Sequence, residues 1–279
     1  MYWHYSHDIF RGQDFRTAFN EIANISTFFP HVPLAALSGT LTMSLMKRLP
    51  KMLGLRQPVI ISSSPHRPHI FLTNIVKESN RDCLSIYENI FIPEIDKLHQ
   101  DPQNYPVTLC FIPYQYMSAA LGYCEQKFGP PSLETTVYGA LYSRQDKTVT
   151  DVIIHELKKD SPWIRFVLTT SVSGMGFDSP SVSHIIHCVP PRNISQYLQE
   201  IGRSGRCYQN SFATLYWCAN DIKKNLPGIK ACIQNYCHSS SCLWENILSN
   251  FGFGKLSTSS HSECCMFCKE TKVTAVSKS

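Results

Sequence analysis

The 279-residue sequence contains no G-x-x-x-x-G-K-[ST] pattern, the glycine-rich loop with which many nucleotide-hydrolysing proteins hold phosphates. Its first residues show neither a basic leader nor an apolar core of a signal peptide, and no apolar run is long enough to span a bilayer. Charged residues make up 17% of the chain and hydrophobic residues 43%. These fractions exclude a disordered chain and predict a globular protein with an ample core and no membrane partner.

The net charge and the cysteine content bear on the partners and cofactors that this protein could have. The net charge of +5 permits a polyanionic partner but does not demonstrate one. Six of the 12 cysteines fall between Cys232 and Cys268. Without a secretory signal, this clustering favours reduced thiols and a metal site over a disulfide framework.

Strands and helices are expected to alternate through the middle of the chain, because short apolar runs alternate with helical periodicity. The expected strands are 107–112, 135–138, 165–169, 184–188 and 213–217, and the expected helices are 114–128, 145–158 and 194–203. Such repeats predict an α/β fold with a parallel sheet and helices on both faces. We expect the functional segments beyond the carboxyl ends of the strands, where ligands gather in such sheets.

The segment Thr169–Asp178 directly follows an expected strand and contains small hydroxyl residues and two glycines. Its backbone amides could face a nucleotide or a phosphate backbone. Asp178 could accept a hydrogen bond from a ribose hydroxyl or hold a neighbouring arginine. An ordinary glycine–serine turn is the alternative, because G-x-G after a strand is weak evidence alone.

The segment 196–206 contains Gln199 and, after it, two arginines that are each preceded by a glycine at a short spacing. In a helix that continues through Arg203, Gln199 and Arg203 share a face, and Arg206 follows one turn later. Gly202 and Gly205 have no side chains, so a large anion or a second domain could approach the backbone there. A fork-shaped guanidinium suits the charge on a transferring γ-phosphoryl group. The alternative is a basic helix end that complements its own dipole.

Four stretches together resemble the RecQ-like DNA helicases of superfamily 2. Residues 167–206 resemble the fifth and sixth motifs of these helicases, and Gly12–Arg16 resembles the end of their aromatic-rich loop. Phe29–Thr40 resembles the third motif with its preceding strand, and Ser64–His69 resembles the segment that joins the two motor domains. The order and spacing of these matches identify the chain as similar to the C-terminal part of that family.

The resemblance implies a RecA-like sheet followed by a small helical zinc-binding subdomain, in a motor that moves 3′ to 5′ along single-stranded or partly duplex DNA. ATP with Mg²⁺ would bind between two RecA-like domains, and zinc would be a second cofactor. It implies a nuclear protein of DNA repair or recombination, or a nucleoid or cytoplasmic one in a prokaryote. The implied catalytic residues are Gln199, Arg203 and Arg206, the nucleotide-binding ones Gly176, Asp178 and Gly202, and the nucleic-acid-binding ones Arg16, Arg67, Thr169 and Ser171. Arg16 and Arg67 are equally consistent with ordinary surface charges.

The sequence departs from the family in its first part. Where the acidic metal-holding motif is expected, near positions 3 to 6, it has Trp-His-Tyr-Ser, and Arg11 stands at the position of the family's loop tryptophan. We therefore expect only the end of the first motor domain. Either this remnant folds back on the second domain, or the chain is a fragment of a longer protein in which the rest of the first domain is its partner. Without its phosphate lysine and magnesium carboxylate, a motor loses its main stabilisers of phosphoryl transfer, so we expect no ATP hydrolysis by this chain alone.

Three domains and a tail follow from these pieces. Residues 1–70 would be a remnant of the first RecA-like domain, 71–225 the second RecA-like domain, 226–271 the helical zinc module and 272–279 a disordered tail. Apolar residues of the remnant, which would normally pack on the missing sheet, should be exposed. These are Phe28, Phe29 and Leu37.

Cys265 and Cys268 form a C-x-x-C pair, the spacing at which two thiolates reach one tetrahedral zinc. The resemblance implies Cys242 as the third ligand, because the zinc subdomains of the family take their first thiolate from the start of a helix. Cys264 is our choice for the fourth, with His261, Cys237 and His238 as alternatives. A set of buried free thiols is the competing interpretation.

Three functions remain open. The first is the C-terminal portion of an ATP-dependent DNA helicase, and the second is a non-enzymatic DNA-binding or adaptor protein built from the same parts. The third is a different α/β nucleotide-binding protein with a metal appendix. An upstream coding segment with a phosphate loop would distinguish the first from the second.

Overall fold

The structure is a computed structural model that describes residues 24, 28–29, 31–78, 83–132, 136–143, 145–170, 178–206, 208–256 and 263–270. Several positions that carry predictions lie outside the described residues. They are Arg16, Ser171, Gly176, His261 and the tail at 272–279.

Six parallel strands form one sheet in the order β1-β6-β5-β2-β4-β3. Their bounds are β1 Ile70–Val76, β2 Thr108–Phe111, β3 Tyr138–Leu141, β4 Phe166–Thr169, β5 His184–His187 and β6 Ser211–Trp217. The predicted parallel sheet is confirmed. The strand expected at 135–138 begins only at Tyr138, and β1 was not among the expected strands.

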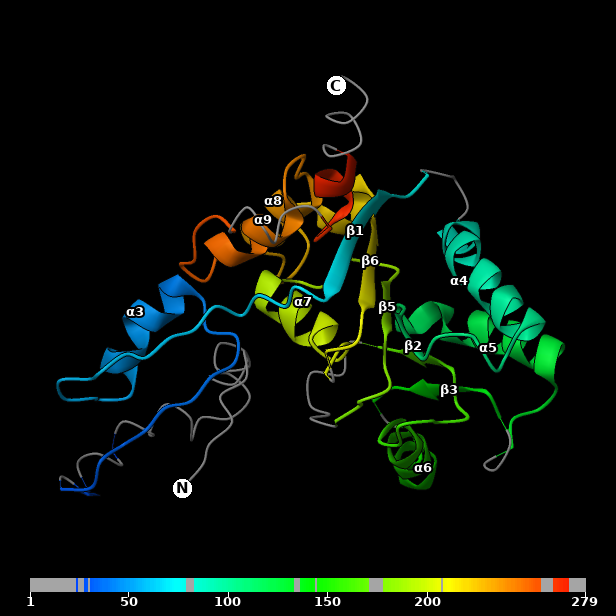
Figure 1. The fold of residues 1–279 in the computed structure, drawn as a ribbon, viewed down its shortest axis with the longest axis horizontal. Coiled ribbons are helices and arrows are strands. Elements are labelled where there is room, and N and C mark those ends of the chain that lie inside the picture. The colour runs from blue at the N-terminus through cyan, green and yellow to red at the C-terminus, as the bar shows by residue number, and fades with distance from the viewer. Residues whose placement is uncertain are drawn as a thin grey trace.

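Helices cover both faces of the sheet, as predicted (Figure 1). The helices are α3 Met43–Met52, α4 Cys83–Gln100, α5 Met117–Phe128, α6 Lys147–Leu157, α7 Ile194–Ile201, α8 Ala231–Cys237 and α9 Leu243–Ser249, with 3₁₀ turns η2 Tyr114–Tyr116 and η3 Ala219–Ile222. Alternate strand residues enter two separate cores. Cys110 and Leu168 pack with α4 and α5, whereas Leu109 and Val167 pack with α6 to α9.

Side-chain caps fix where two of these helices begin. Asp146 accepts hydrogen bonds from the backbone amides of Thr148 and Val149 at the start of α6. Asn193 accepts one from the amide of Gln196 at the start of α7. Such caps satisfy amides that have no partner within the helix, and each contributes on the order of 1 kcal/mol. Helix α7 ends at Ile201, two residues before the predicted end.

Residues 31–65, which we call the arm, include α3 and run beside the C-terminal helices (Figure 1). The amide of Met43 donates to the carbonyl oxygen of Asn250 at 3.1 Å, and Leu49 of α3 is buried. The predicted exposure of Phe28, Phe29 and Leu37 is confirmed. The arm therefore contacts the C-terminal helices through α3, while apolar side chains around position 30 lie open to solvent.

The C-terminal helices pack on the outer strand of the sheet. Trp244 Nε1 donates to the carbonyl oxygen of Ile70 at 3.0 Å, and the amide of Leu72 donates to the carbonyl oxygen of Cys264 at 3.1 Å. Leu72 also forms a parallel bridge with Cys265. Because the edge of β1 is paired in this way, it does not offer a free row of backbone groups along that stretch. The predicted boundary at 225 stays a prediction, since α8, α9 and β1 share one hydrophobic core.

Among the helices of the described residues, none combines the length and the apolar character needed to cross a membrane.

Trp244→Phe should lower the free energy of unfolding by about 1–3 kcal/mol, because it removes the indole donor and leaves the Ile70 carbonyl without that partner. Urea unfolding followed by circular dichroism would measure the loss. Trp163→Phe is the matched control, since Trp163 is 40% exposed, and it should change stability by less than about 0.5 kcal/mol. Equal stability of the two variants would contradict the anchoring role of Trp244.

Candidate functional site

The predicted catalytic side chains lie at the end of α7 and in the turn that follows it. The amide of Gly205 donates to the carbonyl oxygen of Val182, just before β5, and Gly205 lies against His69 and Ser211, at the starts of β1 and β6. The turn that carries Arg203 and Arg206 therefore lies at the amino-terminal ends of β1, β5 and β6. Our expectation that this segment lies beyond the carboxyl ends of the strands was wrong, because α7 runs back along the sheet.

Gly205 is the residue that allows this close approach. Its φ of +65° is a left-handed conformation that residues with a side chain rarely adopt, and a Cβ here would lie 2.4 Å from the His69 ring. The ring of Tyr208 packs edge-on against His69 at 5.6 Å. The arginine turn is thus fixed against the end of the Ser64–His69 segment.

Arg206 forms an ion pair with Asp178, with Nη1 at 2.5 Å from Oδ1. The Arg206 side chain is 36% exposed and that of Asp178 is 69% exposed, so the pair faces solvent and contributes little stability. Of the two roles considered for Asp178, this geometry is that of a holder of the neighbouring arginine. Such an exposed pair can open when an anion competes for the guanidinium.

Arg203 is more deeply placed than Arg206. Burial lowers the pKa of its guanidinium, and the Glu200 carboxylate opposes that shift. The carbonyl oxygen of Arg203 accepts a hydrogen bond from Ser179 Oγ at 3.1 Å. Because an arginine stays charged at any physiological pH, Arg203 brings a partly desolvated positive charge to the turn.

Gln199 contacts the arm. Its Nε2 donates to Thr40 Oγ1 at 2.7 Å, across 159 positions of sequence. Thr40 ends the stretch that resembles the third helicase motif, and Gln199 belongs to the stretch that resembles the sixth. The structure therefore joins these two stretches directly.

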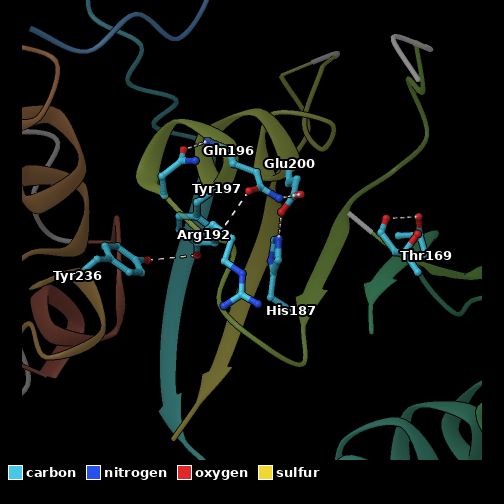
Figure 2. Close-up of polar contacts among 9 residues, drawn as sticks. Thr169, His187, Arg192, Gln196, Tyr197, Glu200 and Tyr236 are labelled. Atoms are coloured by element: carbon cyan, nitrogen blue, oxygen red, sulfur yellow. Dashed lines mark hydrogen bonds and ion pairs between the residues drawn. The ribbon is translucent and has the colours of Figure 1, made fainter. Parts of the chain in front are cut away.

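A buried polar network holds α7 on the sheet (Figure 2). His187 Nε2, at the end of β5, lies 2.7 Å from Glu200 Oε2, and Gln196 Nε2 donates to Glu200 Oε1 at 3.0 Å. The His187 ring stacks on Phe111 at 4.5 Å and packs edge-on against Tyr197. The sequence reasoning missed this network; a histidine at a strand end and a glutamate within the arginine segment were its only signals.

Thr169 ends β4 and is only 4% exposed. Its hydroxyl lies 3.0 Å from the carbonyl oxygen of Leu141 and 2.9 Å from that of Thr170 (Figure 2). Thr169 therefore ties neighbouring strand ends together at the carboxyl edge of the sheet. It does not face solvent there.

Two further predicted residues lie near the arginine turn. Arg67 is half-buried and is flanked by His66, whose ring packs edge-on against Trp244 at 4.9 Å, and by His69. Gly202 caps the carboxyl end of α7 with helical backbone angles. The segment from Ser64 to His69 thus connects the arginine turn to the C-terminal helices.

Four cysteines form the second site. Cys242 stands at the start of α9, Cys264 and Cys265 lie in the segment that pairs with β1, and Cys268 lies in the helical residues that follow. The Sγ atoms of Cys242, Cys264, Cys265 and Cys268 all lie within 4.8 Å of one another. Four thiol sulfurs at such spacing suit a tetrahedral metal ion with metal–sulfur distances of about 2.3 Å. The cluster could therefore hold a metal ion.

The electrostatics of the cluster favour a thiolate at its centre. Hydrogen bonds with the Cys242 and Cys264 thiols lower the pKa of Cys265, and the backbone amides of Leu243 and Cys268 add to that shift. Metal ions bind thiolates and not thiols, so a deprotonated sulfur is a ready ligand.

Of the alternative ligands, His261 lies outside the described residues. Cys237 and His238 are not among the four grouped residues. The ring of His238 packs edge-on against Trp217 at 4.8 Å instead.

A separate groove of about 880 Å³ lies between the arm and the loop after α9. Its lining includes Leu37, Ile60, Phe251 and Phe253, but none of the arginines or cysteines described above. This groove is therefore distinct from both candidate sites.

Comparison with known proteins places the chain in a family. Residues 92–208 match the family described as the helicase conserved C-terminal domain. A putative ATP-dependent RNA helicase of Acanthamoeba polyphaga mimivirus is 30% identical over 211 residues, which cover 76% of this chain and 35% of that protein. The RecQ-like DNA helicase BLM of Xenopus laevis is 24% identical over 214 residues, which cover 76% of this chain and 14% of that protein. The chain carries the C-terminal helicase region of the RecQ-like superfamily 2 helicases.

The fold comparison agrees with the sequence comparison. The structure of S. cerevisiae Dbp5 bound to RNA and ADP BeF3 superposes with a TM-score of 0.50 at 15% identity, covering 77% of this chain and 52% of that one. The likeness shows that the sheet is RecA-like. The chain spans only 14% to 35% of the length of the two curated relatives described above.

Glu200→Ala should lower the free energy of unfolding by about 3 kcal/mol, because it removes the acceptor that the buried His187 shares with the half-buried Gln196. His187 Nδ1 has no hydrogen-bond partner among the described residues, so the ring would then lack partners on both nitrogens. Glu125→Ala, on the exposed side of α5, is the control and should change stability by less than about 0.5 kcal/mol. Chemical denaturation measures both, and a Glu200→Ala variant as stable as its control would argue against the network.

Proposed function

We propose that the chain is the C-terminal portion of a RecQ-like ATP-dependent 3′–5′ DNA helicase and supplies the arginine finger and the DNA-gripping half of the motor. Helicases of this family use ATP with Mg²⁺. The observation that carries the proposal is the bond between Gln199 and Thr40 beside the arginine turn. It brings the stretch that resembles the third motif of the first motor domain onto the helix that bears Gln199, Arg203 and Arg206.

The arginine turn has the properties that γ-phosphate contact requires. Arg206 is partly exposed and held by one exposed carboxylate, while Arg203 is partly desolvated and therefore electrostatically stronger. Gly205 lets the turn lie close to the Ser64–His69 segment, which in the family joins the two motor domains. In the complete motor, these groups would stabilise the charge that builds on the phosphoryl group during transfer.

The opposite edge of the sheet would grip DNA. Thr169 there organises the strand ends, from which the segment with Ser171 and Gly176 departs toward Asp178. We assign DNA as the substrate because the frog relative is named a RecQ-like DNA helicase. The viral relative is named an RNA helicase, so RNA is the competing substrate. A nuclear protein of DNA repair or recombination belongs to the same proposal, as the resemblance to the RecQ-like family implies.

Zinc is the metal that we propose for the four cysteines. All-thiolate tetrahedral sites in proteins are typical of structural zinc, which needs no open coordination position. Cys264 and Cys265 lie in the segment that pairs with Leu72, so the ion would also hold that segment on the edge of β1. When bound, zinc would supply folding energy and no redox chemistry.

A non-enzymatic DNA-binding or adaptor protein is the second candidate. It is favoured by the absence of a phosphate-loop pattern from the sequence. Binding to single-stranded DNA that weakens steeply with salt, without ATP hydrolysis even after fusion to a complete first motor domain, would support it.

The chain alone should hydrolyse ATP no faster than its Arg206→Ala variant in a steady-state assay with single-stranded DNA. Fused to a complete first RecA-like domain of a RecQ-like relative, it should become an ATPase, in which Arg206→Ala lowers kcat by about 10³- to 10⁵-fold. Arg56→Ala, an exposed arginine of the arm, should leave kcat of the fusion unchanged. A fusion that is active and insensitive to Arg206→Ala would refute the arginine-finger assignment.

Cys265→Ser should abolish zinc binding, measured as about one zinc per chain in the unaltered protein by elemental analysis. It should also lower Tm by at least roughly 5 °C, because metal binding and folding of the module are coupled. Cys237→Ser tests the alternative ligand and should retain zinc. Full zinc content in Cys265→Ser, or its loss in Cys237→Ser, would mean that the ligand set is wrong.

A further inference from the structure

Three strand ends are bonded side by side at the carboxyl edge of the sheet. The amide of Ile112, just after β2, donates to the carbonyl oxygen of Thr169 at 2.9 Å. The amide of Thr170 donates to the carbonyl oxygen of Leu141, the last residue of β3, at 3.1 Å. The residues that follow β2 and β3 therefore emerge on either side of the end of β4.

A tyrosine follows each of the two flanking strands. Tyr114 lies in η2 after β2, and Tyr142 comes directly after β3. Their ring centroids are 5.7 Å apart and the ring planes are tilted by 57°. At that separation the rings brace each other, and no third ring fits between them.

Tyr114 is 65% exposed, although the next aromatic residue along the chain is well packed. Tyr116 stacks on Tyr87 at 4.2 Å with an interplanar angle of 27°. In η2, the ring of Tyr116 is thus packed against the protein, whereas the ring of Tyr114 faces solvent. Tyr142, half-buried, supports the Tyr114 ring from the side.

The surroundings of Tyr114 suit a nucleobase better than a protein surface. Its exposed neighbours are polar, Gln115 on the same turn and Ser143 after Tyr142. Among the described residues at the ends of β2, β4 and β3, Tyr114 is the one large exposed hydrophobic side chain; Val76, which is also exposed, lies three strands away at the end of β1. Protein-binding patches are contiguous apolar areas, whereas a single aromatic face with a polar rim is how proteins stack the bases of a single strand.

We propose that Tyr114 is a stacking platform for a base of single-stranded DNA and that Tyr142 positions its ring. The proposal rests on the proposed function, because the DNA strand is expected to cross this edge of the sheet. Such a motor is expected to contact the phosphates of the strand. Stacking on Tyr114 would add a contact with a base, and this contact would not depend on the base sequence.

The test measures the affinity of the whole chain for fluorescently labelled oligo-dT by anisotropy at fixed salt. Tyr114→Ala should weaken binding by about 5- to 100-fold, the range for loss of one stacked base. Tyr114→Phe should bind within about twofold of the unaltered chain, and Tyr142→Ala should show a smaller loss than Tyr114→Ala. The slope of affinity against salt should not change, because phosphate contacts remain.

Phe212→Ala is the matched control, since Phe212 is 52% exposed but lies at the amino end of β6. It should leave the affinity unchanged, and thermal melting checks that each variant is folded. An oligonucleotide of abasic sites should bind the unaltered chain and Tyr114→Ala equally, because it offers nothing to stack.

Four other results would contradict the stacking proposal or the proposed function. If Tyr114→Ala binds oligo-dT normally while the unaltered chain binds it well, stacking at Tyr114 is refuted and the proposed function stands. Equal weakening on the abasic strand would show that the ring does not act through bases. A tenfold preference for oligo-rU would overturn DNA as the strand, and no binding of the unaltered chain to any strand would overturn both proposals.

Discussion

The position of α7 depends on one buried carboxylate. Glu200 lies against His187 at the end of β5 and also accepts from Gln196, one turn earlier on the same helix, so rotation of α7 would break the contact with His187. With that rotation fixed, helical periodicity decides what the other residues face. Tyr197 turns toward α8, where its hydroxyl meets that of Tyr236 at 3.2 Å, and Gln199 turns toward the arm. The arginine turn then follows from where the helix ends.

The cysteine cluster is likewise fixed by contacts with the sheet. Trp244 and Leu72 bond the C-terminal module to β1, and two of the four thiols lie within the paired segment. A metal ion there would fix a segment that also protects the outer strand. The same module contacts His66, so its packing reaches the segment that leads to the arginine turn. The cysteine cluster and the arginine turn are therefore connected through four consecutive residues, His66 to His69.

Local patterns predicted much of this structure, but contacts between distant residues were beyond them. Apolar runs and helical spacing located β2, β4, β5 and β6 and the helices α5, α6 and α7, because each is a local property. The strand expected at 135–138 shares only Tyr138 with β3. Helix α4 was missed, and it contains Pro93, a residue that normally argues against a helix interior. The bond from Gln199 to Thr40 has no local signature at all. The C-x-x-C spacing singled out Cys265 and Cys268, whereas resemblance to a family was needed to add Cys242 to the four cysteines that the fold brings together.

The two ends of the sheet hold different parts of the proposed motor. Arg206 and Asp178 lie at the amino ends of β1, β5 and β6, whereas Thr169 and Tyr114 lie at the carboxyl ends of β4 and β2. The chain between Thr170 and Asp178 joins these ends covalently in eight steps. Any anion that draws Arg206 away from Asp178 therefore acts on one end of a short segment whose other end is bonded to the strand edge. In the proposed motor, this connection would link nucleotide contact at Arg206 to the grip on DNA at the strand edge.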